Sequence, residues 1–251
     1  MSIEEGKTFT TSQIAKAVGV HPNTVRLYEE WQLLQPVPRD EKGYRVYEER
    51  HLRQMQLARQ ALRCEFIAGA IREKATELVK KAAEGDLEVA LMMAYDYLKH
   101  IQQERKKAEE ALDLVKAWLE GKVVPSEEVY YKRVEVARLL GVSIDVLRNW
   151  EREGLIEIPR SDNNYRSYGP KELNRLKVIR TLRSANYSMM AVLRMMRKVD
   201  EGKGEEAYEA INTPEPEEDI IGATDRWIDT LIETEQDAQK VIDELKKMMD
   251  I

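Results

Sequence analysis

Cysteine and histidine are both scarce in this 251-residue chain, which contains one cysteine, Cys64, and three histidines. A single cysteine cannot form an internal disulfide, as expected in a reducing compartment. His21, His51 and His100 lie far from Cys64 and from one another, so the clustered ligands of a metal sensor are lacking. We therefore expect no metal ion and no other cofactor. Redox sensing by Cys64 is a weaker alternative, because a lone cysteine usually serves as a small packing residue.

Long apolar runs and catalytic motifs are missing as well. No stretch of about 18 apolar residues occurs, so no membrane span is expected. The start, MSIEEGKTF, lacks the basic and then apolar pattern of a secretory signal. There is no P-loop, GxSxG, HExxH or glycine-rich dinucleotide motif, so we do not expect an enzyme. With 43% hydrophobic and 34% charged residues, the composition is typical of a soluble, helix-rich protein of the cytoplasm.

The net charge of −6 hides an alternation of basic and acidic segments. Residues 8–72 carry 10 Lys and Arg against 7 Asp and Glu, and residues 130–198 carry 15 against 7. Residues 73–129 and 199–251 are acidic, with net charges of −4 and −12. Two basic segments are therefore available to contact phosphates despite the acidic total.

The two basic segments are copies of one another, which fixes the architecture. A shift of 122 residues, reduced by one after a single deletion, aligns IAKAVGV (14–20) with VARLLGV (136–142), VRLYEEWQLL (25–34) with LRNWEREGLI (147–156), and GYRVY (43–47) with NYRSY (164–168). Glycine, proline and charge interrupt the helical pattern at GKVVPSEEV, residues 121–129, which we interpret as a linker between the copies.

Each copy shows two helices joined by a tight turn, followed by a short hairpin and another helix. In the first copy, a capping box at Thr10 begins the first helix and Gly19 suits the turn after it. In the second copy, Gly141 makes the turn and Ser143 caps the next helix. This pattern predicts a helix-turn-helix, and the turn-rich segment 36–47 predicts a two-stranded wing.

These features resemble the MerR family of bacterial transcription regulators, which follow their helix-turn-helix with an Arg-x-aromatic-Glu step, a leucine pair, a Pro-Arg step and Gly-Tyr-Arg-x-Tyr. The residues that carry the resemblance are Arg26, Tyr28, Glu29, Leu33, Leu34, Arg39, Gly43, Tyr44, Arg45 and Tyr47 in the first copy, and Arg148, Trp150, Glu151, Leu155, Ile156, Arg160, Tyr165, Arg166 and Tyr168 in the second. The second copy departs from the family at Asn164, in place of the wing glycine, and at Trp150. Members of the family normally carry one such module and form dimers.

The resemblance implies a mostly α fold with two winged helix-turn-helix domains, each followed by a long helix of the coiled-coil type. The expected divisions are a first winged helix-turn-helix at 8–85, a helical segment with the first coiled-coil helix at 86–120, the linker at 121–129, a second winged helix-turn-helix at 130–204, and a helical segment with the second coiled-coil helix at 205–251.

The second helix of a helix-turn-helix enters the major groove with its N-terminal residues. This geometry nominates Pro22, Asn23, Thr24 and Arg26 in the first copy, and Ser143, Asp145, Arg148 and Asn149 in the second. The wing residues expected to hold phosphate and sugar are Arg39, Lys42, Arg45, Arg160, Asn163 and Arg166. Further contacts to the DNA backbone are expected from Tyr28, Tyr47, Tyr168 and Lys171.

Several of these residues also have a structural interpretation. Phosphates would repel Glu29 and Glu151, so we expect these two carboxylates to pair with Arg45 and Arg166 inside each module. Tyr44 and Tyr165 are expected to pack the wing against the core. Tyr28 and Trp150 are balanced between packing and contact with the DNA backbone.

The segments after the two copies have the spacing of coiled-coil helices. Apolar residues follow a heptad seam at Ile101, Ala108, Leu112, Val115 and Leu119, and a longer seam runs through Thr224, Trp227, Leu231, Thr234, Ala238, Val241, Leu245 and Met248. We expect residues 99–120 to pack against 223–249, which would make one chain a monomeric pseudo-dimer. The alternative is pairing between chains, which would give a homodimer.

The predicted function is therefore a transcription regulator that binds double-stranded DNA and is associated with the nucleoid in the cytoplasm. RNA polymerase is a further partner that the resemblance implies. An architectural, nucleoid or partition-type protein that bends or bridges DNA is the alternative, and an adaptor that has lost DNA binding is a third. Whether the chain activates or represses does not follow from its sequence.

Overall fold

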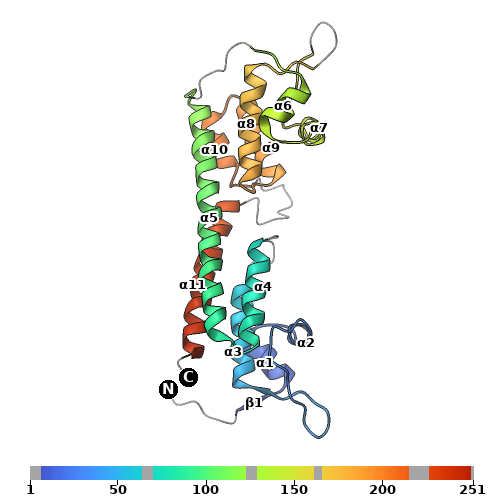
Figure 1. The fold of residues 1–251 in the computed structure, drawn as a ribbon, viewed down its shortest axis with the longest axis vertical. Coiled ribbons are helices and arrows are strands. Elements are labelled where there is room, and N and C mark those ends of the chain that lie inside the picture. The colour runs from blue at the N-terminus through green and yellow to red at the C-terminus, as the bar shows by residue number, and fades with distance from the viewer. Residues whose placement is uncertain (1–6, 64–69, 123–128, 161–165, 215–225, 250–251) are drawn as a thin grey trace. The chain divides into compact units, whose positions relative to one another are not determined.

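A computed structural model describes residues 7–63, 70–122, 129–160, 166–214 and 226–249, and the chain divides into two compact units. Unit 1 comprises residues 1–103 and 231–251, and unit 2 comprises residues 104–230. Both units are mostly α, as the sequence predicts (Figure 1). No helix among the described residues is long and apolar enough to cross a membrane.

Unit 1 contains the first copy, which we call module one and which comprises the described part of residues 8–83. Its elements are β1 (Thr8–Phe9), α1 (Thr11–Val18), α2 (Pro22–Glu30), β2 (Tyr47–Glu48), α3 (Glu49–Ala61), α4 (Ala70–Ala83), the part of α5 (Leu87–Leu119) up to Gln103, and α11 (Trp227–Met249) from Leu231 onward. The strands β1 and β2 are antiparallel, with Phe9 opposite Tyr47. Fully buried Ile14, Val25 and Met55 from α1, α2 and α3 form the core of this module.

The predicted caps of the first helix-turn-helix are present. The hydroxyl of Thr10 accepts a hydrogen bond from the N–H of Gln13, whose side chain accepts one from the N–H of Thr10. Gly19 ends α1 in the left-handed conformation, with a φ of 68°. His21 caps α2 through Nδ1, which lies 3.2 Å from the N–H nitrogen of Asn23. These local interactions fix where both helices begin and how the chain turns between them.

Within unit 1, α11 runs antiparallel to the first part of α5. The amide of Gln102 donates to the carboxylate of Glu235 at 2.9 Å. Nearer the start of α5, the ring of Tyr95 lies 5.7 Å from the ammonium nitrogen of Lys246. The predicted pairing of the two long helices within one chain is therefore present in this unit, and it extends to Tyr95, beyond the predicted segment 99–120. Residues 223–225 lie outside the described residues.

Unit 2 contains the second copy, which we call module two and which comprises the described part of residues 131–200. Its elements are the part of α5 from Glu104 onward, α6 (Arg133–Leu140), α7 (Ile144–Arg152), α8 (Pro170–Ser184), α9 (Met189–Asp200), α10 (Gly204–Ala210) and the first residues of α11. The turn between α8 and α9 docks on α5, because buried Tyr187 donates its hydroxyl to the carbonyl of Ala108 at 3.3 Å. In the same turn, Asn186 donates its side-chain amide to Glu104 at 2.8 Å. Burial raises the pKa of Tyr187 above its ordinary value.

The third helix of each module begins with the same kind of cap but with a different residue. In module one, Nδ1 of His51 accepts a hydrogen bond from the N–H of Glu48 at 2.9 Å. In module two, the carboxylate of Glu172 accepts one from the N–H of Gly169 at 2.9 Å. His51 is fully buried, and this desolvation lowers its pKa. One cap is thus a neutral imidazole and the other a carboxylate.

Module one should lose stability in mild acid. The unfolded chain takes up a proton on His51 near pH 6.5, whereas the folded chain does so only at lower pH. The free energy of unfolding should therefore fall as the pH drops below about 6.5, by at most about 1.4 kcal/mol per pH unit, until the folded pKa is reached. Urea unfolding of the wild type and of His51→Asn, which keeps an acceptor but does not titrate, measures the difference. An identical pH dependence in both proteins would refute the assignment.

Candidate nucleic-acid interface

The recognition helix of module one, α2, exposes two side chains in contact with each other. The guanidinium of Arg26 donates through Nη1 to Oδ1 of Asn23 at 2.8 Å, and both residues are exposed. Pro22 and Thr24 beside them are half-buried. The free donors of Arg26 and the amide of Asn23 are groups that can bond guanine and adenine edges.

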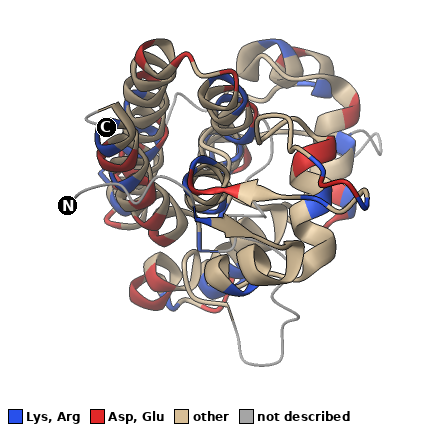
Figure 2. Ribbon diagram, turned by 90° about the horizontal axis from the view of Figure 1, so that it is seen from below, with Lys and Arg blue, Asp and Glu red and all other residues tan. Residues whose placement is uncertain are grey.

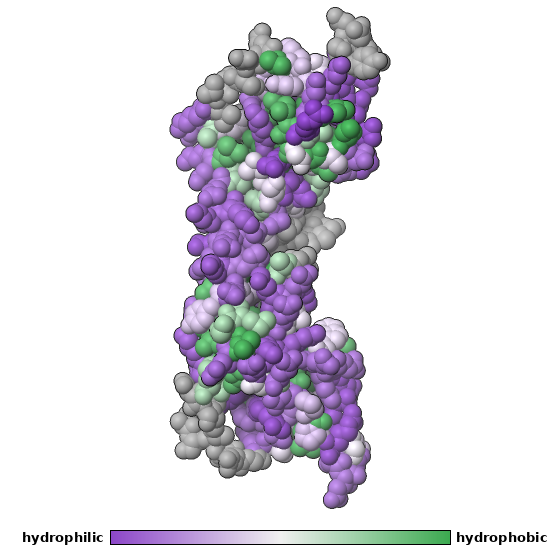
Figure 3. Space-filling model, in the orientation of Figure 1, coloured by the Kyte–Doolittle hydropathy of each residue, from purple (hydrophilic) through white to green (hydrophobic). Residues whose placement is uncertain are grey.

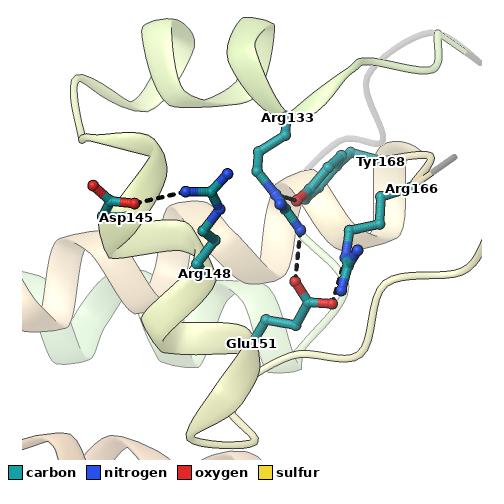
Figure 4. Close-up of polar contacts among 6 residues, drawn as sticks. All are labelled: Arg133, Asp145, Arg148, Glu151, Arg166 and Tyr168. Carbon is teal, nitrogen blue, oxygen red and sulfur yellow. Dashed lines mark hydrogen bonds and ion pairs between the residues drawn. The ribbon is translucent and has the colours of Figure 1, made fainter.

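The recognition helix of module two, α7, repeats this arrangement with a different charge. Arg148 donates through Nη1 to Asp145 at 2.9 Å, three residues away (Figure 4). Arg148 and Asp145 keep 61% and 85% of their side-chain surface exposed. Asp145 stands at the position that Asn23 occupies in module one, so a carboxylate replaces a neutral amide on the surface expected to face DNA.

Two further predicted contacts on α7 have partners within the protein. Ser143 uses its hydroxyl to cap α7, accepting from the N–H of Val146 at 3.2 Å. Half-buried Asn149 accepts a hydrogen bond from Arg152 through Oδ1. Ser143 therefore serves the start of the helix, whereas Asn149 keeps its amide N–H groups for an outside acceptor.

The predicted wing of module one is present. Arg39 and Arg45 form an antiparallel bridge, and the N–H of Val46 donates to the carbonyl of Pro38 at 2.8 Å. Asp40 closes the tip, because its carboxylate accepts from the N–H groups of Lys42 and Tyr44 at 3.0 and 2.8 Å. The side chains of Arg39 and Lys42 are exposed, as phosphate contacts require.

The wing of module two is described only at its base. Arg160 and Arg166 form the equivalent bridge, and the N–H of Ser167 donates to the carbonyl of Pro159 at 3.0 Å. Asn163 and Tyr165 lie outside the described residues, so the predicted contact at Asn163 stays a prediction. Arg160 is exposed, as is Lys171 at the start of α8.

Each wing is tied to its recognition helix by an ion pair, as predicted. Arg45 Nε lies 2.6 Å from the Glu29 carboxylate, and this hydrogen bond raises the pKa of Arg45. In module two, Glu151 bonds Arg166 at 2.5 Å and also Arg133 at 2.8 Å (Figure 4). Arg45 and Arg166 are half-buried in these pairs, so part of their role is structural.

Sequence analysis missed Arg133, whose guanidinium joins three parts of module two. It bonds Glu151 through Nη2 and the hydroxyl of Tyr168 through Nε, the latter at 3.0 Å (Figure 4). Thr11 is its counterpart in module one and lies beside the Tyr47 hydroxyl. The repeat alignment could have identified Arg133, because it aligns this cation with a neutral residue, Thr11, at the start of the first helix. Module two thus has one more positive charge at the base of its wing.

The aromatic residues lie elsewhere than expected. Tyr47 and Tyr168 are 0% and 2% exposed, so their rings pack the wing against the helices and offer no surface to a duplex. Tyr28 and Trp150 are also buried, which decides their balance in favour of packing. Tyr44 was expected to pack against the core, and this expectation is wrong, because 69% of its surface is exposed at the tip of the wing. The burial of Tyr28, Tyr47 and Tyr168 therefore argues against their predicted contacts with DNA.

The two modules also differ on the outer face of their first helix. In α6, Val134 and Leu139 are 54% and 58% exposed, where α1 has Ser12 and Ala17. Apolar surface is correspondingly visible over the module of α6 and α7 (Figure 3). In the view from below, Lys and Arg are interspersed with Asp and Glu along the helices (Figure 2).

The described residues contain no group of three or more His, Cys, Asp and Glu side chains that could hold a metal ion. Cys64 lies outside the described residues, so the redox alternative stays untested.

Removing the central carboxylate should cost module two more stability than module one. Glu151→Gln leaves Arg133 and Arg166 side by side without a counter-charge, so the free energy of unfolding should fall by about 1 to 2 kcal/mol. Glu29→Gln leaves only Arg45 unpaired and should cost less. Urea unfolding measures both, with Glu157→Gln at an exposed position as the control. Equal losses would show that Arg133 adds nothing to the cluster.

Comparison with known proteins identifies these modules. The family model described as MerR HTH family regulatory protein matches residues 9–76 and 131–199, which together are more than half of the chain. The HTH-type transcriptional regulator CueR of Escherichia coli O6:H1 is 42% identical over 55 residues, 22% of this chain and 41% of CueR. A probable heavy metal-dependent transcriptional regulator of Haemophilus influenzae is 36% identical over 70 residues, 28% of this chain and 55% of that protein.

A third relative is the HTH-type transcriptional regulator ZntR of Escherichia coli K12, which is 34% identical over 65 residues, 26% of this chain and 46% of ZntR. The chain thus spans about half of the length of the curated relatives it matches. No solved structure matches it. The two separate matches to one family model agree with the duplicated helices, caps and wings, and the chain belongs to the MerR family of helix-turn-helix regulatory proteins, whose module it carries twice.

Proposed function

We propose that the protein is a transcription regulator that binds double-stranded DNA sequence-specifically, with one recognition helix and one wing in each module. The observation that carries the proposal is the matched pair of contacts on the first turns of α2 and α7, Asn23 with Arg26 and Asp145 with Arg148. All four side chains are exposed on helices whose starts are capped by their own neighbours. Residues of this kind at this place read base edges in the major groove.

The wings support the proposal through charge. Arg39 and Lys42 in module one, and Arg160 and Lys171 in module two, are exposed, and their charge suits phosphates. The segments around the modules carry net charges of +3 and +8. Phosphate contacts made by such segments give an affinity that falls steeply with salt.

We further propose that the two modules of one chain serve one DNA site, as a pseudo-dimer. The antiparallel pairing of α11 with α5 inside unit 1 supports this, because it uses within a single chain the helix surfaces that could otherwise join two chains. Because both modules belong to one chain, binding of one module to DNA raises the effective concentration of the other at the same site. RNA polymerase as a partner and a location at the nucleoid belong to the same proposal. The relatives are named as transcriptional regulators, which agrees with it.

Charge reversal on the two recognition helices should weaken binding unequally. Arg148→Glu would place two carboxylates against DNA, because Asp145 loses its partner, whereas Arg26→Glu places its carboxylate beside neutral Asn23. We expect each to weaken binding by at least about tenfold, with the larger loss at Arg148. Titration of a labelled operator at several salt concentrations measures this, with exposed Lys99→Glu on α5 as control. Equal losses at both arginines would contradict the asymmetry.

The pseudo-dimer has a definite mass. Light scattering at micromolar concentration should give one chain of 29.2 kDa, and the complex with a short operator should contain one chain. A free species of twice that mass would favour the homodimer instead. Footprinting on genomic DNA then separates regulation from architecture, since a regulator protects one short site and an architectural protein covers many sites with little sequence preference.

A further inference from the structure

A cavity of about 350 Å³ lies in unit 1, beside module one. Four segments line it, namely the loop after α2 at Gln35, the start of α3, the end of α4 with the turn into α5, and the end of α11. Its volume is within the range of small-molecule sites, and it lies away from the recognition helix and the wing tip. The question is which chemistry its lining would recognise.

Two opposite charges in the lining are unpaired. Glu49 and Arg53 lie one turn apart on α3, and both are half-buried. A glutamate four residues before an arginine normally favours an ion pair along the helix. Neither side chain forms an ion pair or hydrogen bond with another described residue, however, whereas the neighbouring Arg50 pairs with Glu48 at 3.1 Å. The cavity therefore has a free anion and a free cation on one wall.

A buried amide stands beside these charges. Gln54 is only 3% exposed, and its Oε1 accepts a hydrogen bond from the N–H of Gln35 at 3.0 Å. Its Nε2 donors have no partner among the described residues. An acceptor bound in the cavity could take a hydrogen bond from this amide. Gln54 thus adds a donor suited to the oxygen of an anionic group.

Three other lining residues are apolar. Buried Ala82, near the end of α4, faces the cavity together with Leu87 of α5 and Met248 of α11. An aliphatic or aromatic body would be desolvated against these side chains, and the flexible methionine can adapt to its shape. Among the described residues the lining therefore offers one unpaired cation, one unpaired anion, an amide donor and an apolar surface, beside Gln35 and the paired Arg50.

We propose that this cavity binds a small α-amino acid with an apolar side chain. Arg53 and the amide of Gln54 hold the carboxylate, Glu49 holds the ammonium group, and Ala82, Leu87 and Met248 cover the side chain. A hydrophobic anion would leave Glu49 unpaired and a hydrophobic cation would leave Arg53 unpaired, so only the zwitterion satisfies both charges. This binding site is independent of the proposed DNA function, and its test uses no DNA.

Titration calorimetry on the full chain tests the proposal with L-leucine, L-methionine and L-phenylalanine as probes. Two analogues of leucine separate its charges, since leucinamide lacks the carboxylate and 4-methylpentanoate lacks the ammonium group. Leucine should bind, and both of its analogues should bind about tenfold more weakly than leucine or worse, because each loses a charge-assisted hydrogen bond. Absence of binding by all three amino acids at millimolar concentration would overturn the proposal, as would equal binding of leucine and either analogue.

Two variants assign the charges to their residues. Glu49→Gln should weaken leucine about tenfold but leave 4-methylpentanoate unchanged, and Arg53→Gln should weaken leucine but leave leucinamide unchanged. The unchanged analogue shows in each case that the cavity is still formed. Arg59→Gln, on the same helix but outside the lining, is the matched control and should bind leucine like the wild type. Variants that bind leucine as tightly as the wild type would place the ligand elsewhere and refute the site.

Discussion

The arrangement of each module depends on one carboxylate at the end of its recognition helix. Glu29 and Glu151 hold the wing arginines Arg45 and Arg166 at hydrogen-bonding distance, although both glutamates lie in segments expected to face phosphates. Among the described residues each wing has one antiparallel bridge, which is too little sheet to be stable without support from the helices. The ion pair supplies the missing constraint and neutralises the carboxylate. If the module binds DNA as we propose, the angle between helix and wing is already set, so less ordering has to occur on binding.

The two modules share this ion pair and the same order of helices, but they differ in the side chains that form equivalent hydrogen bonds. A neutral imidazole starts α3 where a carboxylate starts α8, because both can accept from the same N–H group. Arg133 takes the position of Thr11 and extends the ion pair to the buried Tyr168 hydroxyl. What persists is thus the hydrogen-bonding role at each position, and what varies is its charge.

Much of the fold followed from local rules that act over a few residues. The caps at Thr10 and Ser143 and the turn at Gly19 could be predicted, because they join residues close in the sequence. The pairing of Glu29 with Arg45 was predicted on another ground, since a carboxylate near phosphates needs a cation as partner. Most of the remaining features depend on which way a side chain points from the wing. Alternation along such a short strand decides whether a tyrosine faces the core or solvent, and a shift by one residue reverses the answer.

The burial of the wing tyrosines and the position of the cavity depend on tertiary packing, which the spacing of residues in the sequence does not determine. Tyr47 is buried and Tyr44 exposed, opposite to expectation, because Tyr47 pairs with Phe9 beside the helices whereas Tyr44 lies at the tip of the wing. The cavity beside α3 was equally beyond sequence analysis, since Glu49, Leu87 and Met248 meet only when three distant segments pack together. Its polar groups looked like ordinary helix surface in the sequence.

The exchange of Asn23 for Asp145 has a consequence for the kind of DNA sequence that such a protein can select. Two identical subunits related by a twofold axis present the same reader twice, so their target must repeat itself in inverted form. Here the readers are not identical, since an amide partners one arginine and a carboxylate the other. A duplex bound by both modules would be recognised in one direction only. The protein would then bind a promoter with a fixed orientation, whereas a symmetric dimer binds equally well in both orientations.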